Sequence, residues 1–322
     1  MKLEQLYSLI GPDMQAVDAV IRERLHSEVV LVGQVAEYII SAGGKRMRPA
    51  LVLLSAGAMG YKGTQHHELA ATIEFIHTAT LLHDDVVDES DLRRGRKTAN
   101  AIFGNAASVL VGDFLYSRAF QMMVNIGEMR IMRVLSDATN IIAEGEVLQL
   151  MNCHNADVDE KRYLQVIRFK TAKLFEAASR LGAIVGQADT DTEQALADYG
   201  MHLGTAFQLI DDVLDYSGAE EETGKHLGDD LAEGKPTLPL IHVMQNGTTA
   251  QAQCVRSAIE NGGRDDFPAV LAAIRTTGAL EHTRKLAQEE AERATNAIKS
   301  LPASTYKNSL VELALFAVAR SF

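Results

Sequence analysis

The stretch LADYGMHLGTAFQLIDDVLD, residues 196–215, carries the clearest periodic pattern in the chain. Its apolar positions are Leu196, Tyr199, Leu203, Phe207, Ile210 and Leu214. They recur at steps of 3, 4, 4, 3 and 4 residues, which average the 3.6-residue repeat of an α-helix. The residues just before the stretch, Thr190-Asp191-Thr192-Glu193, predict a capping box. The pattern therefore predicts a long helix that begins near residue 190 and carries three aspartates close to its end.

The remaining sequence also favours helices over strands. A second helical stripe runs through Leu69, Ile73, Ile76 and Thr80. Only 6 prolines occur in 322 residues, and no alternating apolar and polar run bounded by turn residues predicts a sheet. Glycine-rich or polar breaks separate the helical stretches, and none has the composition of an inter-domain linker. We therefore predict one all-α domain over residues 1–322.

Composition and charge restrict the class of protein. Hydrophobic residues make up 47% of the chain, which is typical of a globular protein, and 43 acidic against 31 basic residues give a net charge of −12. This charge argues against nucleic-acid binding and requires metal ions or a local basic cluster for any anionic substrate. The chain has two isolated cysteines, Cys153 and Cys254, and neither a secretory signal nor a membrane span is recognisable. These features predict a cytoplasmic location.

Two DDxxD motifs are the strongest chemical signal. The first aspartate motif comprises Asp84, Asp85 and Asp88, and the second comprises Asp211, Asp212 and Asp215. On a helix, residues i and i+4 share a face and residue i+1 lies about a quarter turn away, so each motif gathers three carboxylates around one turn. One such motif is readily explained as a solvated helix end, but two copies after apolar helical stripes indicate binding of hard divalent ions such as Mg²⁺.

Basic residues near these motifs suit a phosphate-containing substrate. The loop GGKRMRP, residues 43–49, supplies Lys45 and Arg48, and Arg93-Arg94 follows the first aspartate motif. Arginine binds phosphate through two parallel hydrogen bonds, although a solvated run of charges is an alternative explanation. The histidines His66-His67 and His154 have no metal-ligating partner at a useful spacing in the sequence, so no second kind of metal site is expected.

The ordered motifs resemble those of the long-chain trans-isoprenyl (polyprenyl) diphosphate synthases. The matching segments are GGKRMRP, EFIHTATLLHDDVVDESDLRRG, FKTAKLFEA, GTAFQLIDDVLDY and GKHLGDDLAEGKPTLPL, in the order of the family. The resemblance covers essentially the whole chain. It implies an isoprenoid synthase fold with helices surrounding a deep central apolar cavity, and a homodimer.

The resemblance also implies a role for each matching residue. Isopentenyl diphosphate would be bound by Lys45, Arg48, His77 and Arg94. Asp84, Asp88 and Asp211, supported by Asp85, Asp212 and Asp215, would hold Mg²⁺, with three ions per active site. The allylic diphosphate would contact Arg93, Lys170, Thr171, Gln208, Lys225 and Lys235.

The implied reaction is successive 1'-4 trans condensation of isopentenyl diphosphate with farnesyl diphosphate. Ionisation of the allylic C–O bond is favoured when cations neutralise the departing diphosphate, and the double bond of isopentenyl diphosphate then attacks the allylic cation. The resemblance implies an octaprenyl product for a quinone side chain. It also implies contact with a membrane surface, without a membrane span, when the product is released.

Product length would depend on a tunnel beneath the first aspartate motif. The candidate lining residues are Ala79, Thr80 and Ile76 before that motif, and Phe120 or Met123 on a helix predicted over residues 109–124. The resemblance implies that the small Ala79 keeps the tunnel open, whereas helical geometry places Thr80 and Ile76 more squarely below Asp84. Core packing explains Met123 equally well.

Three alternatives stay open at this point. The first is the same chemistry with a product of another length. The second is a non-catalytic partner subunit of a heteromeric synthase, although both aspartate motifs are intact here. The third is a terpene cyclase, which would not need the second-substrate cluster of Lys45, Arg48, His77 and Arg94.

Overall fold

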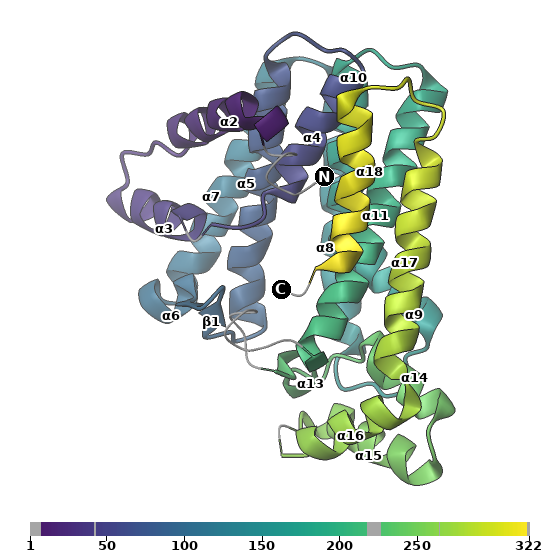
Figure 1. The fold of residues 1–322 in the computed structure, drawn as a ribbon. Helices are drawn as coiled ribbons and strands as arrows, with labels where there is room; N and C mark the ends of the chain where they lie inside the picture. Colours follow the sequence, from purple (N-terminus) through teal and green to yellow (C-terminus); the bar gives the residue numbers. More distant parts are fainter. Residues whose placement is uncertain (1–7, 42, 218–226, 264, 321–322) are drawn as a thin grey trace. The chain divides into compact units, whose positions relative to one another are not determined.

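A computed structural model describes residues 8–41, 43–217, 227–263 and 265–320 of the chain (Figure 1). Nearly all regular structure in these residues is helical, so the all-α prediction is confirmed. The chain divides into two compact units. Unit 1 comprises Met1–Thr139, Leu174–Gly200 and Thr295–Leu313, and unit 2 comprises Asn140–Lys173, Met201–Ala294 and Ala314–Phe322. The single domain predicted over residues 1–322 stays a prediction.

Unit 1 contains most of the N-terminal helices and one short hairpin. Its elements are α2 (Gly11–Arg24), α3 (Val30–Ser41), α4 (Met47–Ala58), α5 (Gln65–Val87), β1 (Leu92–Arg93), β2 (Arg96–Lys97), α6 (Ala99–Phe103) and α7 (Asn105–Ile126). Helix α10 (Lys173–Val185) belongs to it almost entirely, and α8 (Met129–Asn152), α11 (Thr190–Ser217), α17 (Ala279–Ala297) and α18 (Thr305–Ala319) have residues in both units.

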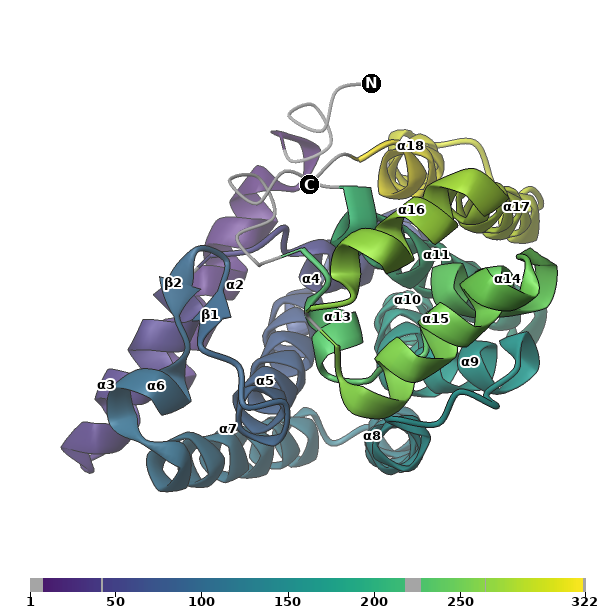
Figure 2. The same cartoon turned by 90° about the horizontal axis from the view of Figure 1, so that it is seen from below.

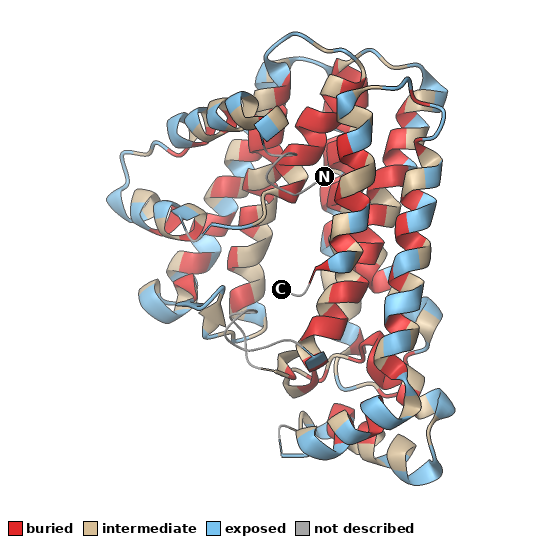
Figure 3. Cartoon of the chain, viewed as in Figure 1, coloured by how far each residue is buried: buried red, intermediate tan, exposed pale blue. Residues whose placement is uncertain are grey.

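Helix α5 is central to the packing of unit 1. It lies alongside α7 and also contacts α4 and α2. Its predicted apolar stripe is buried, with Leu69, Ile73 and Ile76 fully inaccessible to solvent. Burying each of these side chains contributes about 1.5–3 kcal/mol, which fixes the face that α5 turns to the core. Helix α4 is apolar on almost all sides and is correspondingly buried along most of its length (Figure 3).

The β1–β2 hairpin was not predicted from the sequence. Leu92 pairs with Lys97 and Arg93 with Arg96 in an antiparallel register. The two connecting residues, Arg94 and Gly95, have φ angles of 52° and 71°. Two consecutive residues with positive φ give a turn whose twist matches that of paired strands, and glycine adopts this conformation readily. The strands are too short for an alternating pattern, so periodicity could not reveal them.

Unit 2 contains the remaining helices, and three of them form a small cluster. Besides the shared helices, the unit holds α9 (Glu160–Ile167), a π-helical turn η1 (Arg168–Ala172), α13 (Asp229–Ala232), α14 (Leu238–Asn246), α15 (Thr249–Asn261) and α16 (Phe267–Thr277). Helices α14, α15 and α16 pack against one another (Figure 2). Buried Leu240, Ile259 and Ile274 join them in one apolar core.

The long helix predicted from residues 196–215 is confirmed as α11, but its cap differs from the prediction. Asp189 precedes the helix, and its carboxylate accepts a hydrogen bond from the amide of Thr192 at 2.8 Å. Glu193 is instead buried between Arg130 and Arg180. The predicted capping box is therefore wrong, because a tertiary ion-pair cluster holds the glutamate that the box required.

No helix in the described part of the chain is long and apolar enough to cross a membrane.

Candidate active site

The first aspartate motif lies at the C-terminal end of α5 in unit 1. Asp84 and Asp88 are half-buried and occupy successive turns, with the amide of Asp88 donating to the carbonyl of Asp84 at 2.8 Å. Asp85 is fully buried. The outer aspartates therefore share one helical face, and the middle one points into the protein.

Arg93 from β1 holds the middle aspartate in place. Its Nε and Nη2 atoms lie 2.7 and 2.6 Å from Asp85 Oδ1. The side-chain amide of Asn100 donates to the Asp85 carbonyl at 3.1 Å, so backbone and side chain are both anchored. The β1–β2 hairpin thus connects Arg93 to the end of α5. Arg93 is the arginine expected to contact the allylic diphosphate.

The loop before α4 and the first turn of that helix carry two residues predicted to bind the second substrate, Lys45 and Arg48. Arg48 donates a hydrogen bond to His77 Nε2 at 3.0 Å, and its guanidinium lies 4.5 Å from the centre of the Phe175 ring. Lys45 is half-buried on the same loop. Phe175 was missed by sequence reasoning, because nothing about a lone aromatic in α10 identifies an arginine stacked on it.

Gly44 allows the hairpin to approach this loop closely. A Cβ atom at Gly44 would lie 2.8 Å from both terminal nitrogens of the Arg94 guanidinium, which is too close for a real side chain. Arg94 itself adopts a left-handed backbone conformation at the hairpin turn. Within unit 1, Arg94 therefore lies against the loop that carries Lys45 and leads into the helix of Arg48.

His77 is surrounded by positive charge. Burial lowers its pKa well below the usual histidine range, and Arg48, Arg94, Arg93 and Arg46 each lower the pKa further. The ring is therefore neutral at physiological pH, and its Nε2 accepts the hydrogen bond from Arg48. Glu74 pairs with Arg46 at 3.0 Å and Asp85 with Arg93 at 2.6 Å, so part of this positive charge is balanced within unit 1.

The second aspartate motif lies near the end of α11 in unit 2. Asp211 is half-buried and pairs with Arg320 at 2.6 Å, while Asp215 is half-buried. Asp212 is buried and accepts hydrogen bonds from the Tyr163 hydroxyl at 2.5 Å and from Gln208 Nε2 at 3.0 Å. As in the first motif, the outer aspartates are half-buried and the middle one is buried.

These contacts extend to further predicted residues. The Thr171 hydroxyl donates to Gln208 Oε1 at 3.0 Å, so Thr171, Gln208 and Asp212 form one hydrogen-bonded chain. Burial, followed by repulsion from Asp230, raises the pKa of Asp212 to about 8. The two groups that donate hydrogen bonds to this carboxyl, the Tyr163 hydroxyl and the Gln208 amide, are both neutral. Tyr163 and Arg320 were missed by sequence reasoning, because both lie outside the recognisable motifs.

Lys170 and Thr171 lie on η1, the π-helical turn between α9 and α10. π-Helical turns occur frequently at functional sites because they redirect side chains within a helix. Lys170 pairs with Glu146 of α8 at 2.6 Å. A Cβ atom at Gly145 would lie 2.6 Å from the Lys170 amide nitrogen, so the glycine allows α8 to pack directly against η1. Gly145 was also missed by sequence reasoning.

Lys235 is half-buried and pairs with Glu233, and its amide donates to the Asp230 carbonyl at 2.8 Å. Lys225 lies outside the described residues.

The predicted tunnel residues belong to two packed helices of unit 1. Ala79 and Ile76 of α5 are fully buried, and Met123 of α7 is 1% exposed. Thr80 and Phe120 are half-buried. Of these residues, Thr80 and Phe120 are partly accessible to solvent, whereas Ala79, Ile76 and Met123 are enclosed by their neighbours.

A known protein family matches most of the chain. Residues 29–274 match the family model described as polyprenyl synthetase. The chain belongs to this family. Its members extend trans-prenyl diphosphates with the help of Mg²⁺, so the predicted enzyme class, a prenyltransferase, is confirmed.

Several relatives resemble this polyprenyl synthetase family member over their full length. Identity is 55% over 321 residues to the octaprenyl diphosphate synthase of Escherichia coli (strain K12), covering 99% of each chain. It is 51% over 323 residues to the enzyme of that name from Haemophilus influenzae, covering 100% of this chain and 98% of the other. A polyprenyl synthase from Caulobacter crescentus CB15, crystallised with calcium and isoprenyl diphosphate, has a TM-score of 0.97 and 45% identity, covering 100% and 98%.

Proposed function

We propose that the protein is an all-trans-octaprenyl diphosphate synthase that extends farnesyl diphosphate with isopentenyl diphosphate. Relatives of 55% and 51% identity carry that name and match the whole chain. The structural observation that carries the proposal is the cluster of Arg46, Arg48, Arg93 and Arg94 around neutral His77. Glu74 pairs with Arg46 at 3.0 Å and Asp85 with Arg93 at 2.6 Å, and a gathering of arginines of this kind suits an anionic ligand such as a diphosphate.

The outer aspartates fit Mg²⁺ by the chemistry of their donors. Asp84, Asp88, Asp211 and Asp215 are half-buried carboxylates, and hard oxygen ligands are those that Mg²⁺ prefers. We assign ion binding to Asp84, Asp88 and Asp211, with three Mg²⁺ per active site. When bound, Mg²⁺ neutralises the negative charge that develops on the diphosphate as the allylic C–O bond breaks.

The inner aspartates and Asp215 support this site. Asp85 fixes Arg93, and Asp212 fixes Gln208 and, through it, Thr171. We infer that their main contribution is to orient the groups that contact the substrate, because both carboxyls already have close protein partners.

Unit 1 would bind isopentenyl diphosphate through Lys45, Arg48, His77 and Arg94. Arg48 is held by its stacking on Phe175 and its hydrogen bond to His77, so little side-chain entropy is lost when an anion binds. The neutral imidazole of His77 directs Arg48 and adds no further repulsion to the cluster.

The allylic diphosphate would contact Arg93, Lys170, Thr171, Gln208, Lys225 and Lys235. Lys170 and Lys235 are paired with Glu146 and Glu233 in the structure. We expect the diphosphate, which carries more charge than a carboxylate, to replace these glutamates as the partner of each lysine.

These residues account for the reaction in order. Fixed cations stabilise the leaving diphosphate, and the bound isopentenyl group attacks the allylic cation from a near-attack position. The proton that is lost passes to the departing diphosphate, because no side chain of the motifs is suited to be the base. Apolar walls protect the cation from water. We propose that Ala79, Thr80, Ile76, Phe120 and Met123 form those walls and set the product length.

We further propose that the enzyme is a homodimer. Leu110 and Val124 of α7 are 66% and 62% exposed, and their spacing of about four turns places them on one face of the helix. Met129, at the start of α8 in the same unit, is 70% exposed. A second copy covering this face would remove the apolar surface from water. The cytoplasmic location and the membrane contact for product release stay predictions.

An elongation assay tests the proposed function. The full chain is incubated with farnesyl diphosphate, labelled isopentenyl diphosphate and Mg²⁺, with EDTA in a parallel sample, and the dephosphorylated products are sized. Asp84→Asn should abolish elongation, whereas Asp91→Asn, at an exposed aspartate just beyond the motif, should preserve it. A metal-dependent series ending at octaprenol supports the proposal. A series ending elsewhere refutes the product length, and no elongation by folded protein favours a partner subunit.

A further inference from the structure

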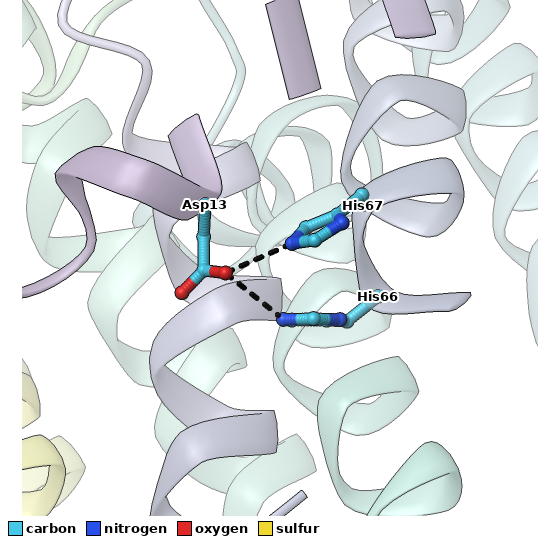
Figure 4. A group of neighbouring side chains, drawn as sticks. All are labelled: Asp13, His66 and His67. Carbon is cyan, nitrogen blue, oxygen red and sulfur yellow. Dashed lines mark hydrogen bonds and ion pairs between the residues drawn. The ribbon is translucent and has the colours of Figure 1, made fainter. Parts of the chain in front are cut away.

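Two histidines and an aspartate lie close together at the N-terminal end of α5, the end opposite the first aspartate motif. His66 and His67 belong to the first turn of α5, and Asp13 belongs to the first turn of α2. The Nε2 atoms of His67 and His66 lie 2.9 and 3.6 Å from the same oxygen, Asp13 Oδ1 (Figure 4). One ligand atom from each residue lies within 4.8 Å of the other two. This site has no signature in the sequence, because Asp13 precedes His66 by 53 positions.

The packing holds both imidazole rings in this arrangement. Consecutive residues on a helix normally point about 100° apart, so two adjacent side chains aimed at one atom require an additional constraint. Here the rings lie against each other with centroids 4.1 Å apart, and the edge of Tyr61 packs on His66 at 5.2 Å. His66 is 8% exposed. The site is therefore organised before any ligand binds.

The chemical state of His66 suits a metal ligand. Histidine binds metal ions through a nitrogen of the neutral imidazole ring. The Nδ1 atom of His66 is buried with no hydrogen-bond partner among the described residues. The ring consequently finds its polar partner only through Nε2, the nitrogen that faces Asp13.

We propose that Asp13, His66 and His67 bind a divalent transition-metal ion of the Zn²⁺ class, with water completing the coordination. Two imidazole nitrogens and one carboxylate oxygen are borderline donors that suit Zn²⁺ and are a poor set for Mg²⁺. Tetrahedral ligation at 2.0–2.2 Å would place donor atoms about 3.3 Å apart. The observed 2.9 and 3.6 Å bracket this separation, so small side-chain rotations are sufficient.

Such an ion would connect α2 to α5 and would take no part in prenyl transfer. From His66 to Asp84 the helix advances 18 residues (84 − 66), or about 27 Å, so the ion would lie far from the first aspartate motif. The expected effect is on stability, because an ion bound only to the folded state stabilises it by mass action. The site would also respond to a different metal from the Mg²⁺ sites of the aspartates.

Cobalt substitution tests the proposal directly. The full chain is titrated with Co²⁺ in the presence of millimolar Mg²⁺, which occupies the oxygen-rich aspartate sites. A nitrogen-containing four-coordinate site gives Co²⁺ a strong visible absorption, whereas six-coordinate oxygen sites absorb weakly. We expect one equivalent of absorbing Co²⁺, displacement by Zn²⁺, and a rise in Tm of about 2–5 °C when Zn²⁺ is added to the apo protein.

Three variants identify the ligands. His67→Gln and Asp13→Asn should abolish the absorption band and the Tm rise while leaving Mg²⁺-dependent elongation at the wild-type rate. The matched control is His282→Gln, which alters the stacked pair of His242 and His282, with ring centroids 4.4 Å apart. No carboxylate completes a three-ligand group with that pair in the described chain. A band that persists in His67→Gln and Asp13→Asn, or is lost in His282→Gln, overturns the proposal.

The wild-type protein provides a decision that does not depend on variants. If it shows no strong band and no Tm rise at saturating Co²⁺ or Zn²⁺, the residues form only an aspartate–histidine hydrogen bond and the proposal is wrong. That outcome leaves the proposed prenyl transfer untouched, because elongation is measured with Mg²⁺ alone.

Discussion

Replacing Asp85 with Asn should destabilise unit 1 far more than the same change at Asp84. Asp85 is fully buried, and Arg93, whose side chain is 19% exposed, lies 2.6 and 2.7 Å from one of its oxygens. Removing one partner of a buried ion pair costs about 3–5 kcal/mol, because the other charge is left without compensation. Since a fifth of Arg93 reaches solvent, we expect the lower end of that range, about 3 kcal/mol. Asp84→Asn, at a half-buried site, should cost less than about 1 kcal/mol.

The assay combines unfolding with catalysis. Urea unfolding of both variants gives the loss in stability, and the elongation assay gives the loss in activity. Asp84→Asn should be nearly as stable as the wild type and inactive, whereas Asp85→Asn should unfold at lower urea and weaken the binding of allylic substrate. In an Arg93→Met background, Asp85→Asn should lose most of its effect on stability, because the partner charge is already gone.

Two results would refute this reasoning. If Asp85→Asn unfolds at the same urea concentration as the wild type, the ion pair with Arg93 does not stabilise the end of α5. If the effects of Asp85→Asn and Arg93→Met simply add, the two side chains act independently and the close contact has no energetic meaning.

Three further predictions concern other residues of the site. Ala79→Tyr should shorten the product, and sizing of the prenyl alcohols checks it; an unchanged length removes Ala79 from the tunnel. Gly145→Ala should displace the Lys170 amide, 2.6 Å from the new methyl group, and raise the KM for farnesyl diphosphate more than that for isopentenyl diphosphate. For His77, whose pKa is lowered, the unfolded chain binds the proton near pH 6.5 and the folded one does not, so stability falls as the pH drops below that value. Between pH 7.5 and 5.5 this loss is about 1.4 kcal/mol, and it should be absent in His77→Gln when urea unfolding is compared at the two pH values.

Much of the fold follows from local pattern. The 3.6-residue stripe in residues 196–215 predicts α11, and the stripe through Leu69 and Ile76 predicts α5, because burial of one apolar face determines where each helix lies. The β1–β2 hairpin could not be predicted, because its strands have two residues each and periodicity needs more. The cap of α11 was misplaced because Glu193 has a stronger competing interaction with Arg130 and Arg180.

The motifs of the candidate site could be recognised in the sequence, whereas the contacts that support them could not. Two DDxxD motifs and the loop with Lys45 and Arg48 have sequence signatures, since several residues of one type must lie at fixed spacing. Phe175, Tyr163 and Arg320 each act alone through contacts between distant parts of the chain. A single residue of a common type leaves no pattern, so only the folded structure reveals what it supports.

The middle aspartates show where sequence reasoning stops. Helical geometry alone places residue i+1 about a quarter turn from the face shared by i and i+4, so it could foresee that Asp85 and Asp212 point elsewhere. It could not foresee their partners, because Arg93 lies 8 residues after Asp85 and Tyr163 lies 49 residues before Asp212. The difference matters chemically. The cation Arg93 pairs with the buried Asp85, whereas burial and repulsion from Asp230 raise the pKa of Asp212 to about 8 despite the hydrogen bonds from Tyr163 and Gln208. Two motifs of the same sequence pattern therefore place their middle aspartates in different surroundings, one beside a cation and the other beside further carboxylates, which disfavour its charged form.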